Sequence, residues 1–336
     1  MAEVYHIPAM LKETIEGLNI KPNGVYVDVT FGGGGHSRAI MEAIDRCAVK
    51  TASPVRSETV SSSDVRPQLY SFDQDIEAYE NEQKRGELLN NPKWQFVHGN
   101  FRYLANFMDY YGVKEIDGLI ADLGVSFHHF DEATRGFSFR FDAPLDMRMN
   151  QKGGQTAADL INIYSEEELT RLLALYGELK NARQIARKLV AARPIVTTGD
   201  VVSVLVESRK SKTENGIAEE LIDLWKKKEL TCVFQALRIA VNDELGALRE
   251  MLVAAKDLLK PGGRIVVLTY HSLEDRIVKN FLRSGNLEGE IEKDFYGNII
   301  TPFKLIEKGR SAGEEEVARN PRARSAKLRV AEKVER

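Results

Sequence analysis

The chain of 336 residues is long enough for one large domain or two smaller ones, with 43% hydrophobic and 29% charged residues. Its formal net charge of −3 argues against a wholly basic nucleic-acid coat protein, although it is compatible with a local basic patch. No run of about 18 apolar residues occurs, so we expect no transmembrane helix and no membrane partner. Residues 1–8 lack the features of a signal peptide, and Cys47 and Cys232 form no metal-spaced motif. These features predict a protein of the reducing cytoplasm.

Five short, nearly continuous apolar runs predict buried parallel strands. In chain order they are residues 25–30, 69–72, 95–97, 118–121 and 264–269. Segments able to form crossover helices separate the first four, which predicts a doubly wound α/β sheet. Two later runs, residues 303–306 and 327–330, are expected to add an antiparallel hairpin at one edge.

A glycine-rich turn follows the first predicted strand. Gly32 to Gly35 are consecutive, and a helix is predicted to begin near His36. Because glycine has no Cβ, another molecule can approach this backbone closely, and a helix start offers unpaired N–H groups. The spacing departs from the G-x-G-x-x-G fingerprint of dinucleotide enzymes, since Ser37 stands at its last position. Asp28, inside the strand, suits a cationic or hydroxyl-bearing ligand better than a pyrophosphate. S-adenosylmethionine carries both positive charge and hydroxyl groups.

Acidic and aromatic residues follow the later strands. Asp73 closes the second run, where a carboxylate can accept hydrogen bonds from both hydroxyls of a ribose, while Asp75 is expected to start the next helix. Phe101 follows the third run and is placed to pack on an adenine, and Asp122 ends the fourth. Because ligands bind outside the carboxyl ends of parallel strands, we expect these side chains to face one crevice.

More than a hundred residues separate the fourth and fifth predicted strands, and most of them have helical periodicity. Ser165 begins a capping box, and Gly177 is expected to end that helix. A second helix is predicted over residues 178–192, and Thr198 is expected to cap a third. We therefore predict a helical domain, residues 130–229, inserted between two parts of the sheet domain, residues 1–129 and 230–336. Residues 49–66 are expected to form a surface loop, and residues 209–216 a linker.

Eight motifs together carry a resemblance to one family. They are His6-Ile-Pro8, Asp28-Val-Thr-Phe-Gly-Gly-Gly-Gly-His-Ser37, Asp122-Leu-Gly-Val-Ser126, Arg135-Gly-Phe-Ser-Phe139, Pro144-Leu-Asp-Met-Arg-Met149, Phe234-Gln-Ala-Leu-Arg238, His271-Ser-Leu-Glu-Asp-Arg276 and Asn320-Pro-Arg-Ala-Arg-Ser325. In this order and over nearly the whole chain, the sequence resembles the MraW/RsmH family of ribosomal RNA methyltransferases. The resemblance implies a class I S-adenosylmethionine-dependent methyltransferase with a mostly parallel, doubly wound seven-stranded sheet, its inserted helical domain recognising the substrate.

The resemblance also implies an activity and a set of site residues. The activity is methylation of the N4 amine of a cytidine in the decoding region of 16S ribosomal RNA, so the partner would be this RNA or the small ribosomal subunit. Carried over by position, the cofactor contacts would be Gly34, Gly35, His36, Asp73, Phe101, Asp122 and His129. Family members often have Gln where His129 stands, and the segment before Pro67 is longer here than usual.

The chemistry of an exocyclic amine limits which types of residue could catalyse its methylation. Its lone pair is delocalised into the ring, so catalysis would orient the amine in line with the sulfonium methyl and accept its N–H groups. Methylation at cytosine C5 would instead need a cysteine nucleophile, and neither Cys47 nor Cys232 has a reactive setting. The candidate acceptors are backbone carbonyls after Asp122, Ser272 and His271, and a purely structural histidine explains His271 equally well. The six histidines show no zinc-ligand spacing, so no metal is expected.

Arginines supply candidate RNA contacts. They are Arg135, Arg140 and Arg148 near the start of the insert, Arg183 and Arg187 four residues apart on one predicted helix, and Arg322 and Arg324 near the carboxyl end. From residue 301 onward ten Lys or Arg residues stand against six Glu, which favours a basic segment there. The neighbouring rings Phe127, Phe130, Phe137, Phe139 and Phe141 are expected mostly to pack in a core.

Three other functions stay open at this point. One is an amino-methyltransferase acting on another RNA or on DNA. A nicotinamide-binding oxidoreductase is another, opposed by Asp28 and by the missing spaced glycines. The third is a non-catalytic nucleotide-binding factor of ribosome assembly. The sequence contains no signal for an oligomeric state.

Overall fold

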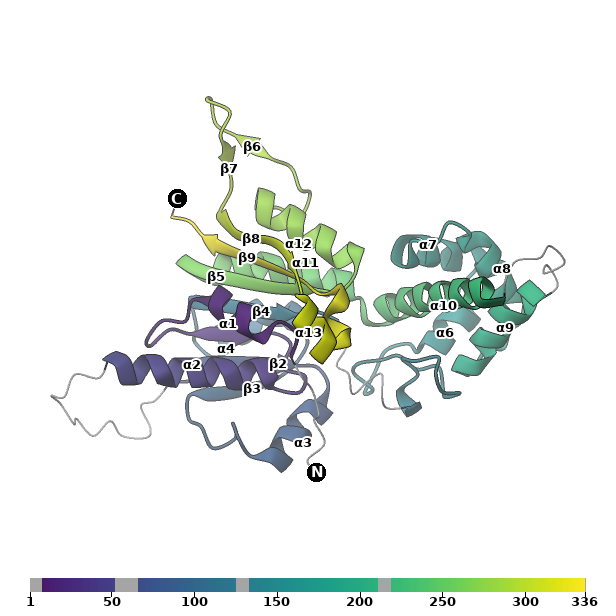
Figure 1. The fold of residues 1–336 in the computed structure, drawn as a ribbon, viewed down its shortest axis with the longest axis horizontal. Helices are drawn as coiled ribbons and strands as arrows, with labels where there is room; N and C mark the ends of the chain where they lie inside the picture. The colour runs from purple at the N-terminus through teal and green to yellow at the C-terminus, as the bar shows by residue number, and fades with distance from the viewer. Residues whose placement is uncertain (1–7, 52–65, 125–132, 211–218, 336) are drawn as a thin grey trace. The chain divides into compact units, whose positions relative to one another are not determined.

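The computed structural model describes residues 8–51, 66–124, 133–210 and 219–335 (Figure 1). His129, Phe127 and Phe130 lie outside these ranges, as do most of the predicted surface loop and linker. The chain divides into two compact units: Met1–Gly124 with Leu245–Arg336 form a sheet unit, and Val125–Glu244 form a helical unit. The boundary predicted after residue 229 falls inside a helix, α10 (Glu219–Asn242).

The sheet unit is built on seven strands. They are β1 (Tyr26–Asp28), β2 (Leu69–Asp73), β3 (Trp94–His98), β4 (Ile116–Asp122), β5 (Leu259–Thr269), β8 (Phe303–Ser311) and β9 (Lys327–Lys333), in the order β3-β2-β1-β4-β5-β9-β8. The first five pair in parallel, and β9 runs antiparallel to both its neighbours. The predicted mostly parallel, doubly wound sheet is thereby confirmed. Its strand order reverses between β1 and β4, which is where ligands bind in such sheets.

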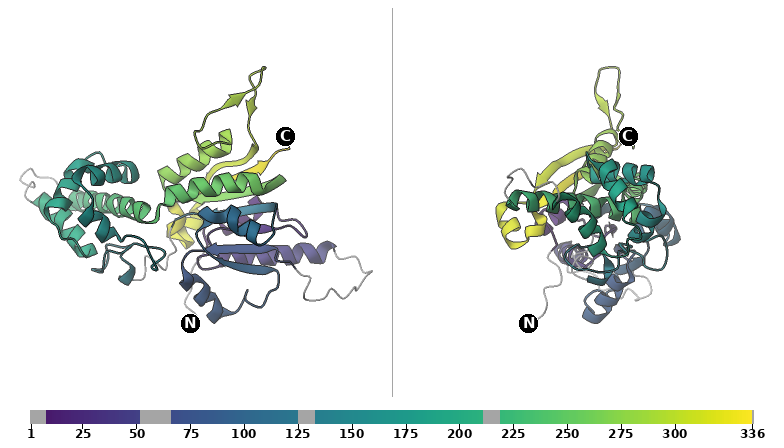
Figure 2. Two further views of the ribbon diagram at one scale, coloured as in Figure 1. Left: turned by 180° about the vertical axis from the view of Figure 1, so that it is seen from behind. Right: turned by 90° about the vertical axis from the view of Figure 1, so that its right-hand side faces the viewer.

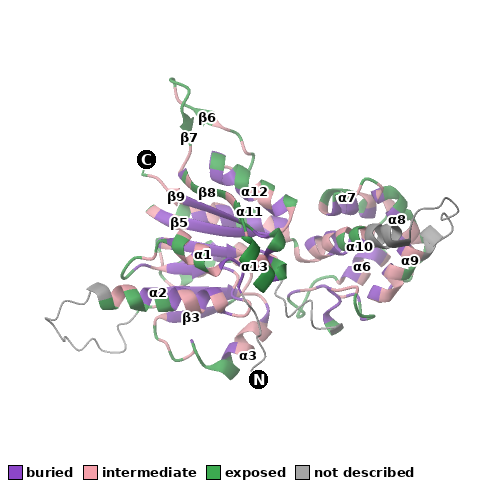
Figure 3. Ribbon diagram, in the orientation of Figure 1, coloured by how far each residue is buried: buried purple, intermediate pink, exposed green. Residues whose placement is uncertain are grey.

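Helices cover both faces of this sheet (Figure 2). On one face α1 (Leu11–Leu18), α2 (Gly35–Thr51) and α3 (Ile76–Arg85) pack on strand residues such as Tyr26 and Val266. The opposite face carries α4 (Leu104–Tyr110), α11 (Glu244–Leu258) and α12 (Ser272–Ser284), which pack on Val27 and Val267. Because successive side chains of a strand point to opposite faces, the continuous apolar runs fill both cores. Figure 3 shows the buried residues concentrated along the strands and on one side of the helices.

The edge of the sheet near the carboxyl end differs partly from the prediction. Residues 303–306 and 327–330 do lie in antiparallel neighbours, β8 and β9. They are not joined by a short turn, because α13 (Glu314–Arg319) and a 3₁₀ helix, η4 (Pro321–Ser325), come between them. A separate short hairpin, β6 (Glu292–Lys293) with β7 (Ile299–Ile300), has no counterpart in the sequence prediction.

The helical unit contains α6 (Ala157–Ile163), α7 (Glu166–Gly177), α8 (Ala182–Ala191), α9 (Thr198–Lys210) and α10, after a short 3₁₀ helix, η2 (Ala133–Arg135). Leucine and isoleucine side chains from all five α-helices form its core. The capping box is confirmed, since the Ser165 hydroxyl accepts the Glu168 N–H and the Glu168 carboxylate accepts the Ser165 N–H. Among the helices of the described residues, none combines the length and apolar character needed to cross a bilayer.

Thr198 does not cap α9, so that prediction is wrong. The hydroxyl of the preceding residue, Thr197, accepts the Asp200 N–H at 3.2 Å, and the Asp200 carboxylate accepts the Thr197 N–H at 2.8 Å. The Thr198 hydroxyl instead donates to the carbonyl of Phe141 (2.6 Å) and accepts the N–H of Ala143 (3.0 Å). By sequence, either of the two adjacent threonines could cap the helix. Packing against residues 141–143 engages Thr198 and leaves the cap to Thr197.

Candidate functional site

The glycine turn after β1 presents backbone without side chains. The Gly34 N–H donates to the carbonyl of Phe31 (2.7 Å), and Gly34 has a φ of +74°, which favours glycine. A Cβ at Gly34 would lie 2.8 Å from both the Phe31 ring and the Arg38 guanidinium, and one at Gly35 would lie 2.8 Å from Pro8. The turn therefore has no room for a side chain at either position.

Asp73 connects the end of β2 to this turn. One carboxylate oxygen accepts the Gly32 N–H at 2.8 Å, and the other accepts the Asp75 N–H at 2.9 Å. Asp75 then caps α3 by accepting the Glu77 N–H, as predicted. The backbone carbonyl of Asp73 also accepts the Gly99 N–H beyond β3. The carboxyl ends of β1, β2 and β3 are thus joined through one half-buried acidic residue.

Asp122, at the end of β4, is the centre of a second group. The Tyr270 hydroxyl donates to one of its carboxylate oxygens at 2.6 Å, and His36 Nδ1 lies 3.6 Å from the other. Burial raises the pKa of Asp122 to about 7, nearby Glu274 adds to the rise, and the hydrogen bond from Tyr270 opposes it. Burial also lowers the pKa of His36, which is 4% exposed. Asp122 therefore titrates near neutral pH beside an uncharged imidazole.

Tyr270 is a residue of this group that the sequence analysis missed. It directly follows β5, and burial together with the neighbouring Asp122 raises the pKa of its hydroxyl well above the usual value. The phenol therefore stays protonated and remains a donor to Asp122. Its position after an apolar run, like that of Asp122, was the signal that could have found it.

Asp28 is fully buried inside the fold, which argues against its sequence interpretation as a residue that contacts the ligand. Its side chain is fully buried, one oxygen accepting the Ser37 hydroxyl (2.6 Å) and the other the Thr30 N–H (3.0 Å). The Ser37 and Ser71 hydroxyls lie 2.7 Å apart, and the Trp94 indole N–H donates to Ser71 (2.9 Å). Asp28 thus anchors the start of α2 to the strands beside it. Burial raises the pKa of Asp28, and the hydrogen bonds from Ser37 and Thr30 oppose the rise.

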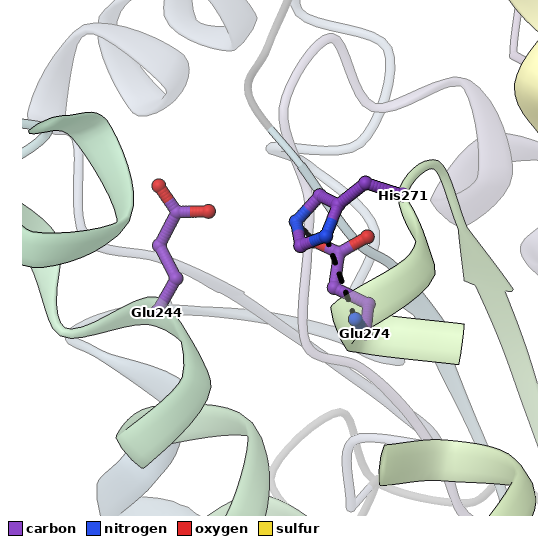
Figure 4. Close-up of side chains that lie close together, drawn as sticks. All are labelled: Glu244, His271 and Glu274. Carbon is purple, nitrogen blue, oxygen red and sulfur yellow. Dashed lines mark hydrogen bonds and ion pairs between the residues drawn. The ribbon is translucent and has the colours of Figure 1, made fainter. Parts of the chain in front are cut away.

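His271 and Ser272 lie at the start of α12. The Nδ1 atom of His271 accepts the Glu274 N–H at 3.5 Å, so His271 is the N-cap of the helix. Its buried Nε2 lies 3.0 Å from the Glu274 carboxylate without forming a hydrogen bond (Figure 4). Glu244, also drawn there, belongs to the helical unit, where it pairs with Arg238 at 2.8 Å. The capping bond supports the structural interpretation of His271, while Ser272 is exposed.

Phe101 begins η1 (Phe101–Tyr103) just beyond β3 and is partly buried against the sheet core. Asp73, Asp122, His36, the glycine turn and Phe101 all follow carboxyl ends of neighbouring parallel strands, as expected. Whether they contact a cofactor stays a prediction, as does the expectation that no metal is bound.

Two of the predicted RNA-contacting arginines form contacts within the helical unit itself. Arg135 is only 2% exposed, and its guanidinium donates to the carbonyls of Arg148 (3.0 Å) and Met149 (3.2 Å). Burial of this kind argues against contact with phosphate. Arg148 forms a two-pronged ion pair with Asp146, with both N–O distances at 2.8 Å. Among the described neighbouring rings, Phe137 is buried and Phe139 packs edge-on against Phe234, which agrees with the expected core packing, whereas Phe141 is 46% exposed and does not.

The other arginines remain on the surface. The side chains of Arg183 and Arg187 on α8 are 76% and 67% exposed, and each lies within 3.7 Å of Glu166. Arg140, Arg322 and Arg324 are also exposed. These five residues stay candidates for contact with RNA.

The composition of the site indicates its ligand class. The carboxylate at the end of β2 suits the hydroxyl groups of a ribose, and the carboxylate at the end of β4 suits a cationic amino group rather than a pyrophosphate, beside a turn without side chains. S-adenosylmethionine combines those groups, and the sheet with its one antiparallel strand is that of the class I methyltransferases. The fold and site thus define a methyltransferase that uses S-adenosylmethionine.

The model of the MraW methylase family matches residues 3–334, so the chain belongs to that family. It is 52% identical over 335 residues to the ribosomal RNA small subunit methyltransferase H of Phocaeicola vulgatus, covering 98% of both chains. The protein of that name from Porphyromonas gingivalis is 49% identical over 336 residues, covering 98% of this chain and 97% of its own. A crystal structure of a putative rRNA methylase from Clostridium thermocellum covers 98% of this chain and 100% of its own at 13% identity, with a TM-score of 0.41. That overlap is too loose to support an argument, and the fold class rests on the strand order of this chain.

Proposed function

We propose that this protein transfers the methyl group of S-adenosylmethionine to the N4 amine of a decoding-region cytidine in the RNA of the small ribosomal subunit. The choice of RNA is supported by sequence identity. About half of all residues, along almost the whole chain, are identical to those of proteins named for that substrate. Such a substrate would place the protein in the cytoplasm.

The positions of the two thiols support nitrogen rather than carbon as the methyl acceptor. Methylation at C5 of cytosine proceeds through a cysteine nucleophile. Cys47 lies twelve residues beyond Gly35 on α2, about 18 Å along the helix axis from the glycine turn. Cys232 lies on α10 in the helical unit, and burial raises the pKa of its thiol, which makes it a poorer nucleophile.

The sheet unit supplies the residues that would hold the methyl donor. When bound, S-adenosylmethionine presents a methyl group on a positively charged sulfur. Asp73 would accept the ribose hydroxyls while its contact with Gly32 keeps the glycine turn in place. Phe101 would pack on the adenine. Asp122, ionised above its pKa of about 7 and held by Tyr270, would bind the cationic amino-acid part, with His36 as its neutral neighbour.

Acceptors for the amine protons would come from the ends of β4 and β5. The exposed Ser272 and the backbone carbonyls after Asp122 are the groups we propose for this role. His271 is less suited, because its Nδ1 already accepts the Glu274 N–H. The helical unit would recognise the RNA, with Arg183 and Arg187 on α8 as phosphate contacts.

The test is methylation of small subunits from a strain that lacks this gene, using S-adenosylmethionine with a labelled methyl group. Mass spectrometry of the digested RNA should find one N4-methylcytidine in the decoding region. The Asp73→Asn variant serves as a binding-impaired control made under the same conditions. Label at C5, on another base or on DNA would refute the proposed specificity, and no transfer to any nucleic acid would favour a non-catalytic assembly factor.

A further inference from the structure

The β6–β7 hairpin carries large apolar side chains into solvent. It projects from the sheet unit beyond α12 and β8 (Figures 1 and 2). Phe295 at its tip is 97% exposed and the adjacent Tyr296 is 86% exposed, with Ile299 and Ile300 on β7 also exposed. Single exposed apolar residues are ordinary, but a group of them marks an interaction site.

The tip is held in a defined conformation. The Asp294 carboxylate accepts the N–H groups of Tyr296 (2.9 Å) and Asn298 (2.8 Å) as well as the Asn298 side-chain amide (2.9 Å). A two-stranded hairpin is marginally stable in water on its own, and these bonds fix its turn. The two rings meet edge to face with centroids 5.6 Å apart. A preformed tip of this kind binds a partner at a lower entropic cost.

The base of the hairpin is anchored as well. The Asn286 side chain accepts the N–H groups of Gly289 (2.8 Å) and Glu290 (3.0 Å) and donates to the Glu290 carbonyl (2.8 Å). Gly285, which ends α12 with a φ of +80°, packs so closely on Pro302 that a Cβ would lie 2.3 Å from the proline ring. The two ends of the hairpin segment are thus held next to each other at the sheet unit.

The charge of the hairpin limits the class of partner that it can bind. Between residues 286 and 300 the acidic residues are Glu288, Glu290, Glu292 and Asp294, and the only basic residue is Lys293. Nucleic acids are bound chiefly through lysine and arginine contacts to phosphate, so this segment would be repelled by an RNA backbone. Aromatic rings on a segment rich in carboxylates are complementary to a basic protein surface that contains an apolar pocket.

We infer that this hairpin docks onto a protein of the small ribosomal subunit, with Phe295 and Tyr296 in an apolar pocket and the carboxylates facing lysines and arginines. The inference rests on the proposed function, which makes a particle of RNA and protein the substrate. The hairpin then adds affinity for the assembled particle that protein-free RNA does not receive.

The test replaces both rings in the variant Phe295→Ser/Tyr296→Ser, whose exposed positions leave the core intact. Tyr110→Ser, at a tyrosine 81% exposed on α4, is the matched control. Binding and methylation are measured on small subunits and on protein-free 16S RNA. We expect the Kd and KM for subunits to rise at least about tenfold, as for interface aromatic hot spots, with kcat and both RNA constants unchanged. Glu290→Lys/Glu292→Lys should weaken subunit binding most at low salt.

Three results would overturn the inference. Equal losses on subunits and on protein-free RNA would mean that the rings stack on bases. Unchanged constants on both would mean that the hairpin docks on neither. A wild-type dimer that the ring variant converts to a monomer in sedimentation would identify a second copy as the partner. If the wild-type protein methylates neither substrate while its binding to subunits still depends on the rings, the proposed function fails and the docking site stands.

Discussion

Replacing Tyr270 by Phe should move the pH at which Asp122 ionises. The substitution removes the 2.6 Å hydrogen bond to the carboxylate and keeps the ring. A hydrogen bond to a charged group contributes about 1.5–3 kcal/mol and one to a neutral group about 1 kcal/mol, so the ionised form loses about 1 kcal/mol more. Because 1.36 kcal/mol corresponds to one pKa unit, the pKa of Asp122 should rise from about 7 to roughly 8.

The assay is calorimetric binding of S-adenosylmethionine between pH 6 and pH 9. If binding requires ionised Asp122, affinity rises with pH through its pKa. At pH 7 the ionised fraction falls from about one half to about one tenth, so Tyr270→Phe should bind roughly fivefold more weakly, and at pH 9 about equally. Tyr111→Phe, at another partly buried tyrosine of the same unit, should keep the wild-type profile. A Tyr270→Phe curve that coincides with wild type, or is lowered equally at every pH, would refute the reasoning.

The same carboxylate should limit stability above neutral pH. Its pKa is raised by folding from 3.8 to about 7, so the folded state loses stability as pH rises between these values and then levels off. The loss is at most roughly 4 kcal/mol. Asp122→Asn should therefore raise the Tm relative to wild type, by a margin that widens up to about pH 7. A margin that shrinks with rising pH would contradict the assigned direction of the pKa shift.

Three further predictions concern single contacts. Gly34→Ala should destabilise the protein by more than about 2 kcal/mol in denaturant unfolding, whereas Gly86→Ala, with a φ of +72° and open space around it, should cost about 1 kcal/mol; equal costs would exclude the close contacts as the cause. His271→Ala should cost about 1 kcal/mol of stability by loss of the α12 cap while kcat is retained, and a collapse of kcat with normal stability would make it catalytic. Arg183→Ala/Arg187→Ala should lower the slope of log K against log salt for RNA binding by about 0.7 per residue, and an unchanged slope would remove both from the interface.

Local patterns determined much of this protein from the sequence alone. The apolar runs identified all seven strands of the main sheet, and the helix starts at Asp75 and Ser165 were predictable because each cap bonds to residues two or three positions away. Such interactions are encoded within a few residues of one another. The acids at the ends of β2 and β4 were located for a related reason, since parallel strands bring their carboxyl ends to one edge.

Only the tertiary structure decided which polar side chains form their hydrogen bonds inside the fold rather than with a ligand. Asp28 accepts a hydrogen bond from Ser37, which in turn meets Ser71 from another strand, and one guanidinium nitrogen of Arg135 donates to the carbonyls of residues 148 and 149. A buried charge must find such partners, and they come from segments whose proximity no local pattern records. The partnership of Tyr270 with Asp122 is of the same kind, because residues 148 positions apart in the chain meet only when β4 and β5 pair.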